Sequence, residues 1–147
     1  NYHEFDCYKF RSMNLNPAAH LEQVSKNDPR ITRVGRFLRK TSIDELPQFI
    51  NVFLGQMSVV GPRPHMVSHT EMYAQRVNKF MVRHFVKPGI TGLAQTKGYR
   101  GEVEKETDII NRVKYDIFYM ENWSILLDIK IIFMTIFNTV KGEDKAY

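Results

Sequence analysis

Apolar positions recur with helical spacing along the second half of the chain. Residues 124–140 are almost continuously apolar and predict a long helix with a broad apolar surface. Residues 104–119 predict a helix with more charged positions, and residues 66–82 predict a polar amphipathic helix. The broad surface of the last helix is typical of the core, which is the default interpretation. Its flanking Trp123 and Lys141 also suit a membrane boundary, and partial membrane contact is the sharper hypothesis.

A further helix is predicted from Asp28 to about Lys40. Asp28 suits the N-cap, and Pro29 suits the first helical position, where a missing N–H costs nothing. Basic residues recur at every third position along one side of this helix, with apolar residues on the other side. This arginine row consists of Arg30, Arg33, Arg36 and Arg39.

The next helix is expected to begin at Asp44. Pro47 would clash inside a helix, so it belongs in the first turn, with Asp44 as the N-cap and Glu45 at the first position. Ser42 and Glu45 also have the spacing of a capping box. The helix is expected to end before Gly55, which suits the left-handed conformation found after helix ends.

Extended and loop segments separate these helices. Residues 5–13 alternate loosely and predict a short strand, and residues 57–60 predict a second extended segment. Loops are predicted at residues 61–64 (a rigid Gly-Pro-Arg-Pro turn), 86–93 and 97–102. We therefore predict one compact domain over residues 1–147. It is expected to be mainly α-helical with a few short β-strands (α+β), and to carry amphipathic helices that suit a membrane interface.

Composition excludes some kinds of protein and site but does not identify the partner. Of the 147 residues, 43% are hydrophobic and 25% charged, which is globular composition and argues against disorder. The single cysteine, Cys7, excludes an internal disulfide and a thiolate zinc site built from this chain alone. Lys and Arg number 21 against 16 Asp and Glu. This positive excess predicts an anionic partner, which could be nucleic acid, anionic lipid or a phosphorylated small molecule.

Two adjacent carboxylates, Asp44 and Glu45, follow the arginine row closely. Helix capping and the helix dipole explain acidic residues in a first turn. Alternatively, an aspartate held ionised by positive neighbours can attack phosphorus or, with Glu45, hold Mg²⁺. The two interpretations are compatible, because a helix end can position a nucleophile.

Weaker candidates lie downstream. Arg63 stands between two prolines that fix the backbone, which suits a guanidinium aimed at phosphate, although a solvated surface turn explains the same residues. Residues 87–92 could cradle an anion but lack the spacing of a phosphate-binding loop. His65 and His69 are spaced i and i+4, and without further ligands they predict a solvated helix face rather than a zinc site.

Motifs in a fixed order along the chain resemble one known family, and they cover residues 9–13, 28–32, 35–55, 57–64, 87–95 and 121–124. The most specific combination is Arg-Lys-Thr-Ser-Ile-Asp-Glu-Leu-Pro-Gln at residues 39–48 with Gly-Pro-Arg-Pro at residues 61–64. Over essentially its whole length the chain resembles the catalytic domain of the bacterial sugar transferases, also called monotopic phosphoglycosyl transferases.

The resemblance implies transfer of a sugar-1-phosphate from a UDP-sugar to polyprenyl (undecaprenyl) phosphate, with release of UMP. It places the protein at the cytoplasmic face of the bacterial inner membrane, at the start of exopolysaccharide, capsule or O-antigen lipopolysaccharide assembly. The family's nucleophilic aspartate corresponds to Asp44, which would form a phosphosugar-aspartate intermediate. The family requires Mg²⁺, and the resemblance makes Asp44 and Glu45 its expected ligands.

The family's cationic positions correspond to Lys9, Arg39 and Arg63, and Arg100 is a further substrate-binding candidate. These residues would screen the charges of the diphosphate donor, the lipid phosphate and the carboxylate nucleophile. The loop at residues 98–102 and the Ala-Tyr ending look more like the branch of the family that transfers glucose-1-phosphate or galactose-1-phosphate.

Other interpretations stay open. Family members carry a membrane-inserting segment before the strand that holds Lys9, whereas this chain begins at Asn1, so we expect a fragment of a longer protein. Whether the chain by itself is soluble, active or a homo-oligomer is left open. The alternative function is a non-catalytic basic module that binds anionic membrane through the arginine row and the last helix. Nucleic-acid binding ranks last, because the sequence has no aromatic RNA-binding motif, zinc finger or separate basic tail.

Overall fold

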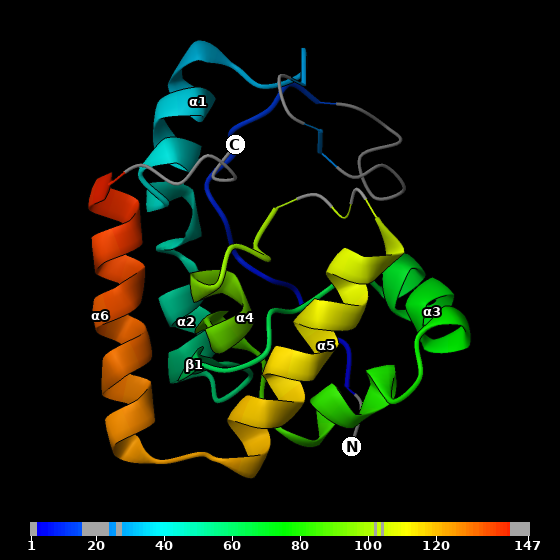
Figure 1. Cartoon of the computed structure of the whole chain (residues 1–147). Coiled ribbons are helices and arrows are strands. Elements are labelled where there is room, and N and C mark those ends of the chain that lie inside the picture. The colour runs from blue at the N-terminus through cyan, green and yellow to red at the C-terminus, as the bar shows by residue number, and fades with distance from the viewer. Residues whose placement is uncertain (1–2, 16–23, 26–27, 102, 104, 142–147) are drawn as a thin grey trace.

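A computed structural model of the chain describes residues 3–15, 24–25, 28–101, 103 and 105–141 (Figure 1). Its α-helices, 3-10 helices (η) and strands are, in chain order, α1 (Arg33–Lys40), η1 (Ile43–Glu45), α2 (Gln48–Phe53), β1 (Ser58–Val60), α3 (Val67–Arg76), η2 (Phe80–Phe85), β2 (Gly89–Thr91), α4 (Leu93–Thr96), α5 (Glu106–Glu121) and α6 (Ile125–Lys141). Strands β1 and β2 pair in parallel, with Ser58 opposite Gly89 and Val60 opposite Thr91. The predicted α+β class is confirmed.

Two apolar clusters hold the helices around this small sheet. The first joins α3, the start of η2 and α5 through Tyr73, Val77, Phe80, Ile109 and Val113. The second joins β1, α4, α5 and α6 through Val60, Leu93, Tyr119 and Ile131. In Figure 1, α6 and α3 lie on opposite sides of the molecule, with α5 between them. Because α5 takes part in both clusters, it is the central scaffold of the domain.

The first predicted helix begins later than the sequence pattern indicated. α1 starts at Arg33, and the hydroxyl of its N-cap, Thr32, accepts a hydrogen bond from Gly35 N at 2.9 Å. Asp28 does not cap a helix, because its carboxylate accepts from the backbone N–H of Arg30 at 2.9 Å and from the Arg30 guanidinium at 2.6 Å. The arginine row is therefore broken, since Arg30 lies before the helix.

The second predicted helix is divided in two. Asp44 and Glu45 lie in η1, and α2 begins only after Pro47. Pro47 cannot donate the hydrogen bond of a continuous helix, so the chain forms a short 3-10 turn and then restarts. Ser42 has a left-handed backbone with φ of 58° and makes no capping bond through its side chain, so both the capping-box and the Asp44 N-cap predictions were wrong. Gly55, with φ of 74°, follows the end of α2 as predicted.

The strand predictions were right in one case. β1 confirms the predicted extended segment. Residues 5–13 form no strand, and within the described part of the chain they pair through a single bridge between Met13 and Ile31. β2 lies within residues 86–93, which were predicted to form a loop because they contain one proline and two glycines. A side chain at Gly89 would overlap the backbone of Gly61, so this glycine permits the close approach of the two segments.

The later helices follow the predicted order with one interruption. The helix expected over residues 66–82 stops at Arg76, because its C-cap Val77 is extended with φ of −113°. The chain continues as η2 after Lys79, which has a left-handed φ of 61°. α5 and α6 confirm the last two predicted helices to within two residues at each end. The glycine-bearing loop after α4 is also present, and Gly98 there has φ of 88°.

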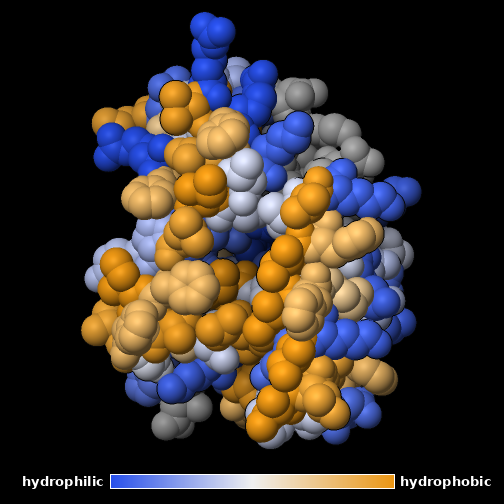
Figure 2. All heavy atoms as spheres, turned by 90° about the vertical axis from the view of Figure 1, so that its left-hand side faces the viewer, coloured by the Kyte–Doolittle hydropathy of each residue, from blue (hydrophilic) through white to orange (hydrophobic). Residues whose placement is uncertain are grey.

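α6 is not a core helix. Ile131 is its one buried residue, whereas Phe133, Phe137 and Val140 are between 66% and 83% exposed, so the core interpretation is wrong for most of the helix. The apolar side of α1 is also exposed rather than buried. We call this exposed apolar surface the apolar face, and it comprises Val34, Phe37, Leu46, Phe49, Ile50, Phe53, Leu54, Ile125, Leu126, Ile129, Phe133, Ile136, Phe137 and Val140. Figure 2 shows it as two bands on one side of the molecule. Within the described part of the chain, no helix has the length and apolar character needed to span a membrane.

Candidate active site

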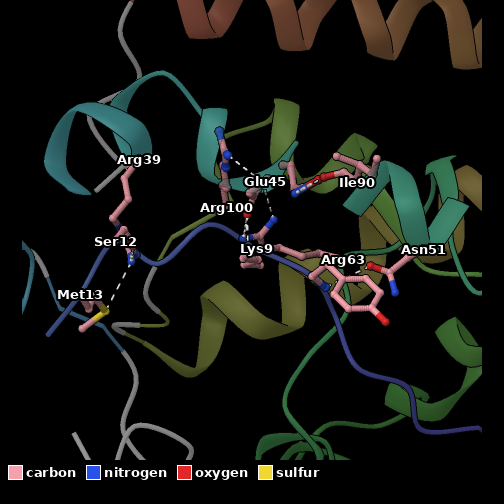
Figure 3. Close-up of polar contacts among 11 residues, drawn as sticks. Lys9, Ser12, Met13, Arg39, Glu45, Asn51, Arg63, Ile90 and Arg100 are labelled. Carbon is pink, nitrogen blue, oxygen red and sulfur yellow. Dashed lines mark hydrogen bonds and ion pairs between the residues drawn. The ribbon is translucent and has the colours of Figure 1, made fainter. Parts of the chain in front are cut away.

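Glu45 is the centre of the candidate site (Figure 3). Its side chain is 7% exposed. Its Oε1 accepts from Arg63 Nη2 at 2.6 Å and from Lys9 Nζ at 3.1 Å, and its Oε2 accepts from Arg100 Nη2 at 2.9 Å. The three cations come from the extended N-terminal segment, the loop after β1 and the loop after α4. The fold thus gathers three of the four predicted cationic residues on one carboxylate.

The N-terminal segment that carries Lys9 is fastened to η1 and α2. Phe10 N donates to the Asp44 carbonyl oxygen at 2.9 Å, and Tyr8 N donates to Asn51 Oδ1 at 3.0 Å. Asn51 is fully buried, and its Nδ2 donates back to a carbonyl oxygen of the same segment at 2.8 Å. Because the residues on both sides of Lys9 are held in this way, its ammonium group is directed at the carboxylate.

The loop that carries Arg63 is held by the sheet. Gly61 N donates to the Thr91 carbonyl oxygen at 2.8 Å, and Gly89 N donates to the Pro62 carbonyl oxygen at 2.9 Å. The turn is non-helical, as predicted, and prolines on both sides of Arg63 limit its backbone. The guanidinium therefore faces Glu45 rather than solvent, and its side chain is 20% exposed.

Asp44 and Glu45 are adjacent carboxylates with opposite electrostatics. Burial alone would raise the pKa of Glu45, but the charges of Arg63, Lys9 and Arg100 outweigh burial and hold that pKa well below its ordinary value. Burial and the negative charge of Glu45 raise the pKa of Asp44, against the opposing charges of nearby cations. Asp44 is 8% exposed, so the dyad combines a firmly ionised Glu45 with a more basic neighbour.

Arg39 lies apart from the Glu45 cluster. Its Nη1 donates to Ser12 Oγ at 3.4 Å and lies 3.7 Å from Met13 Sδ, so the side chain runs toward the N-terminal segment (Figure 3). Its positive charge still acts on the dyad, since it opposes the rise of the Asp44 pKa. The charge of Arg39 therefore acts on Asp44, the predicted nucleophile, but Arg39 is not one of the three cations paired with Glu45.

His65 does not lie on a solvated helix face, so that prediction was wrong for this residue. It precedes α3 and lies between the guanidinium groups of Arg83 and Arg112, with Nε2 3.0 Å from Arg112 Nη1. Burial and the two arginine charges lower the pKa of His65 well below its ordinary value. The sequence analysis missed both arginines and Asp116, although a signal existed: Arg112 and Asp116 stand one turn apart at inward-facing positions of an amphipathic helix.

The adjacent carboxylates of Asp44 and Glu45 differ in how readily they could bind Mg²⁺. Both oxygens of Glu45 already accept from cations, whereas none of the described residues forms a hydrogen bond or ion pair with the Asp44 carboxylate. The described residues also contain no group of three or more His, Cys, Asp or Glu that could hold a metal. Mg²⁺ commonly takes one or two carboxylates and completes its shell with water and substrate phosphates. Asp44 fits such a site, and Glu45 would first have to release its cations.

Two cavities adjoin the charge cluster. The larger, of about 530 Å³, has basic residues in its lining, namely Arg63, Arg83, His84 and Lys87. The smaller, of about 80 Å³, is lined by Glu45 and Arg100 together with Leu46, Phe49, Thr135, Asn138 and Thr139. It lies between α2 and α6, where Figure 2 shows a polar hollow between the two bands of the apolar face.

Comparison with known proteins places the chain among enzymes of one kind. The family model for bacterial sugar transferases matches residues 1–142. The chain is 56% identical over 131 residues to the UDP-glucose:undecaprenyl-phosphate glucose-1-phosphate transferase of Klebsiella pneumoniae, and 53% identical over 131 residues to the protein of that name from Escherichia coli (strain K12). Each match covers 88% of this chain and 28% of the relative.

A third relative has a different named donor. The chain is 46% identical over 160 residues to the UDP-galactose-lipid carrier transferase of Erwinia amylovora, a match that covers 98% of this chain and 32% of the relative. The chain therefore spans under a third of the length of these three relatives.

Proposed function

Because the chain belongs to the bacterial sugar transferase family, we propose that it transfers a sugar-1-phosphate from a UDP-sugar to polyprenyl phosphate and releases UMP. The observation that carries the proposal is a nearly buried Asp44 beside a Glu45 that holds three cations. The names of the Klebsiella and Escherichia relatives favour UDP-glucose as donor and undecaprenyl phosphate as acceptor. The Erwinia relative makes UDP-galactose the second donor to test.

In the first proposed step, a carboxylate oxygen of Asp44 attacks the sugar-bearing phosphorus of the donor. The P–O bond to UMP breaks, UMP leaves with the electron pair, and a phosphosugar-aspartate remains. The ionised carboxylate needs no general base, because it carries no proton. Burial and Glu45 make Asp44 more basic than an ordinary aspartate, which favours attack once it is ionised.

In the second step, a phosphate oxygen of the acceptor attacks the same phosphorus, and the bond to Asp44 breaks to restore the carboxylate. Negative charge accumulates in both steps. Lys9, Arg63 and Arg100 meet this charge, and their common attachment to Glu45 places them in advance. Such preorganised charge requires little rearrangement during the reaction.

We also propose a magnesium requirement. Asp44 would hold the ion together with the phosphates of the donor, since the oxygens of Glu45 are engaged by cations. Mg²⁺ bound in this way would neutralise phosphate charge that otherwise repels the attacking carboxylate.

The apolar face supports action on a lipid at a membrane surface, which we propose is the cytoplasmic face of the bacterial inner membrane. The small cavity at Glu45 and Arg100 lies between α2 and α6, which both contribute to that face (Figure 2). A lipid phosphate could enter this cavity while its apolar chain stays on the face. The larger basic cavity suits the charge of a nucleotide diphosphate, and its volume is in the range of ligand sites. One charge cluster thus adjoins a space for each substrate.

The decisive experiment combines UMP release with intact-mass analysis. The protein, with any natural flanking sequence in place, is incubated with Mg²⁺ and UDP-glucose or UDP-galactose. We expect UMP and a sugar-phosphate adduct on Asp44, and loss of both in Asp44→Asn. Asp6→Asn, which changes an exposed acid on the N-terminal segment, is the matched control and should keep activity. An active Asp44→Asn variant would remove Asp44 as the nucleophile.

The second candidate is a non-catalytic module that binds anionic membrane, and the apolar face is the observation that favours it. This candidate predicts binding to anionic vesicles that weakens with salt and does not depend on Asp44. Vesicle binding by wild type with neither donor giving UMP would favour the module. UMP release that requires Asp44 would exclude the non-catalytic interpretation.

A further inference from the structure

A buried charge network lies behind the loops that carry two of the Glu45 cations. Its base is α5, where Arg112 and Asp116 stand one turn apart and are 4% and 2% exposed. Asp116 Oδ2 lies 2.9 Å from Nη2 of Arg83, a residue of η2 whose side chain is 1% exposed. α5 therefore presents one guanidinium of its own and holds a second through a carboxylate.

Each of these two guanidinium groups donates a hydrogen bond to a loop carbonyl oxygen beside the site. Arg83 Nη2 donates to the carbonyl oxygen of Arg63 itself at 2.7 Å. Arg112 Nη2 donates to the carbonyl oxygen of Gly101 at 2.9 Å, one residue after Arg100. The two loops that reach Glu45 from different parts of the chain are thus both tied to a single helix.

His65 links the two arginines. Its Nδ1 contacts Arg83 and its Nε2 contacts Arg112, while its ring lies edge-on to Tyr73 and Phe80. A neutral imidazole accepts at one nitrogen, and arginine only donates, so His65 accepts from one guanidinium at a time. Only an uncharged side chain is compatible with cations on both sides, and the lowered pKa of His65 keeps it uncharged.

Stability alone does not account for this network. Asp116 forms an ion pair with Arg83, and the charge of Arg112 acts on the same carboxylate. Apolar residues of similar size are commonly at least as stable as such buried ion pairs. The two arginines donate directed hydrogen bonds to loop carbonyl oxygens, those of Arg63 and Gly101. The loop at residues 61–64 has particular need of such a donor, because its two prolines have no backbone N–H.

We propose that Arg83 and Arg112 are positioning residues that hold the loops of Arg63 and Arg100 at the geometry Glu45 requires. The inference rests on the proposed transferase function. Arg83 acts through Arg63, and Arg112 acts through Arg100. Although Arg83 borders the larger cavity, its side chain is 1% exposed and its guanidinium is engaged by Asp116 and by the Arg63 carbonyl, so its role is to position Arg63 rather than to bind substrate. Displacement of a catalytic cation by about 1 Å can cost on the order of 100-fold in rate, so a modest loop shift suffices to reduce turnover.

A double-mutant cycle tests the proposal by UMP release. Arg112→Met is expected to lower kcat about 30-fold, with the KM for the UDP-sugar changed less than about threefold, since the loss is in placement of charge. In an Arg100→Ala background the same substitution should lower kcat less than about threefold, because the residue through which it acts is gone. Arg83→Met should likewise lower kcat much less in an Arg63→Ala background than in wild type. When Arg83→Met is combined with Arg100→Ala, the two losses in kcat should be closer to additive.

Lys114→Met, at an exposed position of the same helix, is the matched control and should change kcat less than about twofold. Equal losses from Arg112→Met in both backgrounds would overturn the proposal, because a purely structural role adds to any other defect. If a methionine variant fails to fold, the lysine variant is used; it keeps the charge and a single donor nitrogen, and it should show the same non-additivity at smaller amplitude. Absence of UMP release by wild type would count against the transferase function itself, whereas additive losses in an active enzyme count only against the positioning role.

Discussion

Glu45 and Asp116 are both buried carboxylates beside arginines, yet their pKa values move in opposite directions. Burial acts against ionisation at each residue. At Glu45 three cations in direct contact outweigh it, and the pKa lies well below the ordinary value. At Asp116 the charges of Arg83 and Arg112 do not outweigh burial, and the pKa is raised to about 6.

The difference lies in how many cations reach each carboxylate and where they come from. The partners of Glu45 arrive on three separate loops and segments, which leaves them partly accessible to a ligand. Among the described residues, Asp116 forms one ion pair, with Arg83, and both side chains are almost completely buried. Glu45 is therefore the centre of a site that can exchange partners with a substrate, and Asp116 is part of the support behind it.

The largest effect is expected when the charge of Glu45 is removed. In Glu45→Gln the three cations lose their common anion and separate, so UMP release should fall at least about 1,000-fold. The variant should retain its far-UV circular dichroism, because the apolar clusters are unaffected. A loss of less than about tenfold would show that Glu45 does not organise the cations for catalysis.

Removal of one Glu45 partner should have the next largest effect. Arg63→Ala deletes the shortest contact to the carboxylate, 2.6 Å, and is expected to lower UMP release on the order of 100-fold. Arg76→Ala, at the exposed end of α3, removes the same charge away from the site and should change it less than about twofold. Equal losses in the two variants would show that Arg63 contributes only general positive charge to the protein surface.

The two carboxylates should respond to pH with opposite sign. A folded-state pKa of about 6 means that folded Asp116 binds its proton more tightly than the unfolded chain, so this residue lowers stability as pH rises from about 4 to 6. From the size of the shift, the loss is at most about 3 kcal/mol. Glu45 does the reverse: its stabilising contribution is fully present above its ordinary pKa and is lost as pH falls from that value through the lowered folded-state pKa.

Urea unfolding of Asp116→Asn, Glu45→Gln and wild type between about pH 3 and pH 7 measures this contrast. The stability of wild type relative to Asp116→Asn should decline as pH rises from about 4 to 6. The stability of wild type relative to Glu45→Gln should decline as pH falls below the ordinary pKa of glutamate. Parallel curves for the two comparisons would contradict the assignment of different electrostatics to the two carboxylates.

The smallest effect is expected at Lys9. Its side chain is 41% exposed and lies 3.1 Å from Glu45, so solvent screens the pair more than it screens the two arginines. Lys9→Met should lower UMP release about tenfold, and added salt should weaken the wild type toward the variant. Lys40→Met, at the exposed end of α1, is the control. A loss as large as that of Arg63→Ala would show that Lys9 contacts substrate directly.

Local pattern was sufficient for part of this protein. The periodicity of residues 104–119 and 124–140 predicted α5 and α6, and Gly55 marked the end of α2, because helix geometry and left-handed turns depend on residues close in the chain. The family motifs at residues 39–48 and 61–64 were also legible in the sequence. Boundaries were less certain, since Thr32 rather than Asp28 caps α1.

The assembled site depends on contacts that no local pattern specifies. Lys9, Arg63 and Arg100 are 36, 18 and 55 residues from Glu45 in the chain, and only packing decides that they share one carboxylate. The same holds for the buried link between Arg83 and Asp116, and for α6, whose apolar pattern is the same whether a protein core or another apolar phase covers it. The sequence by itself determined the helices and the chemical groups, because these follow from neighbouring residues. The tertiary structure alone decided which charges meet and which apolar surface stays uncovered, because burial is a property of the whole fold.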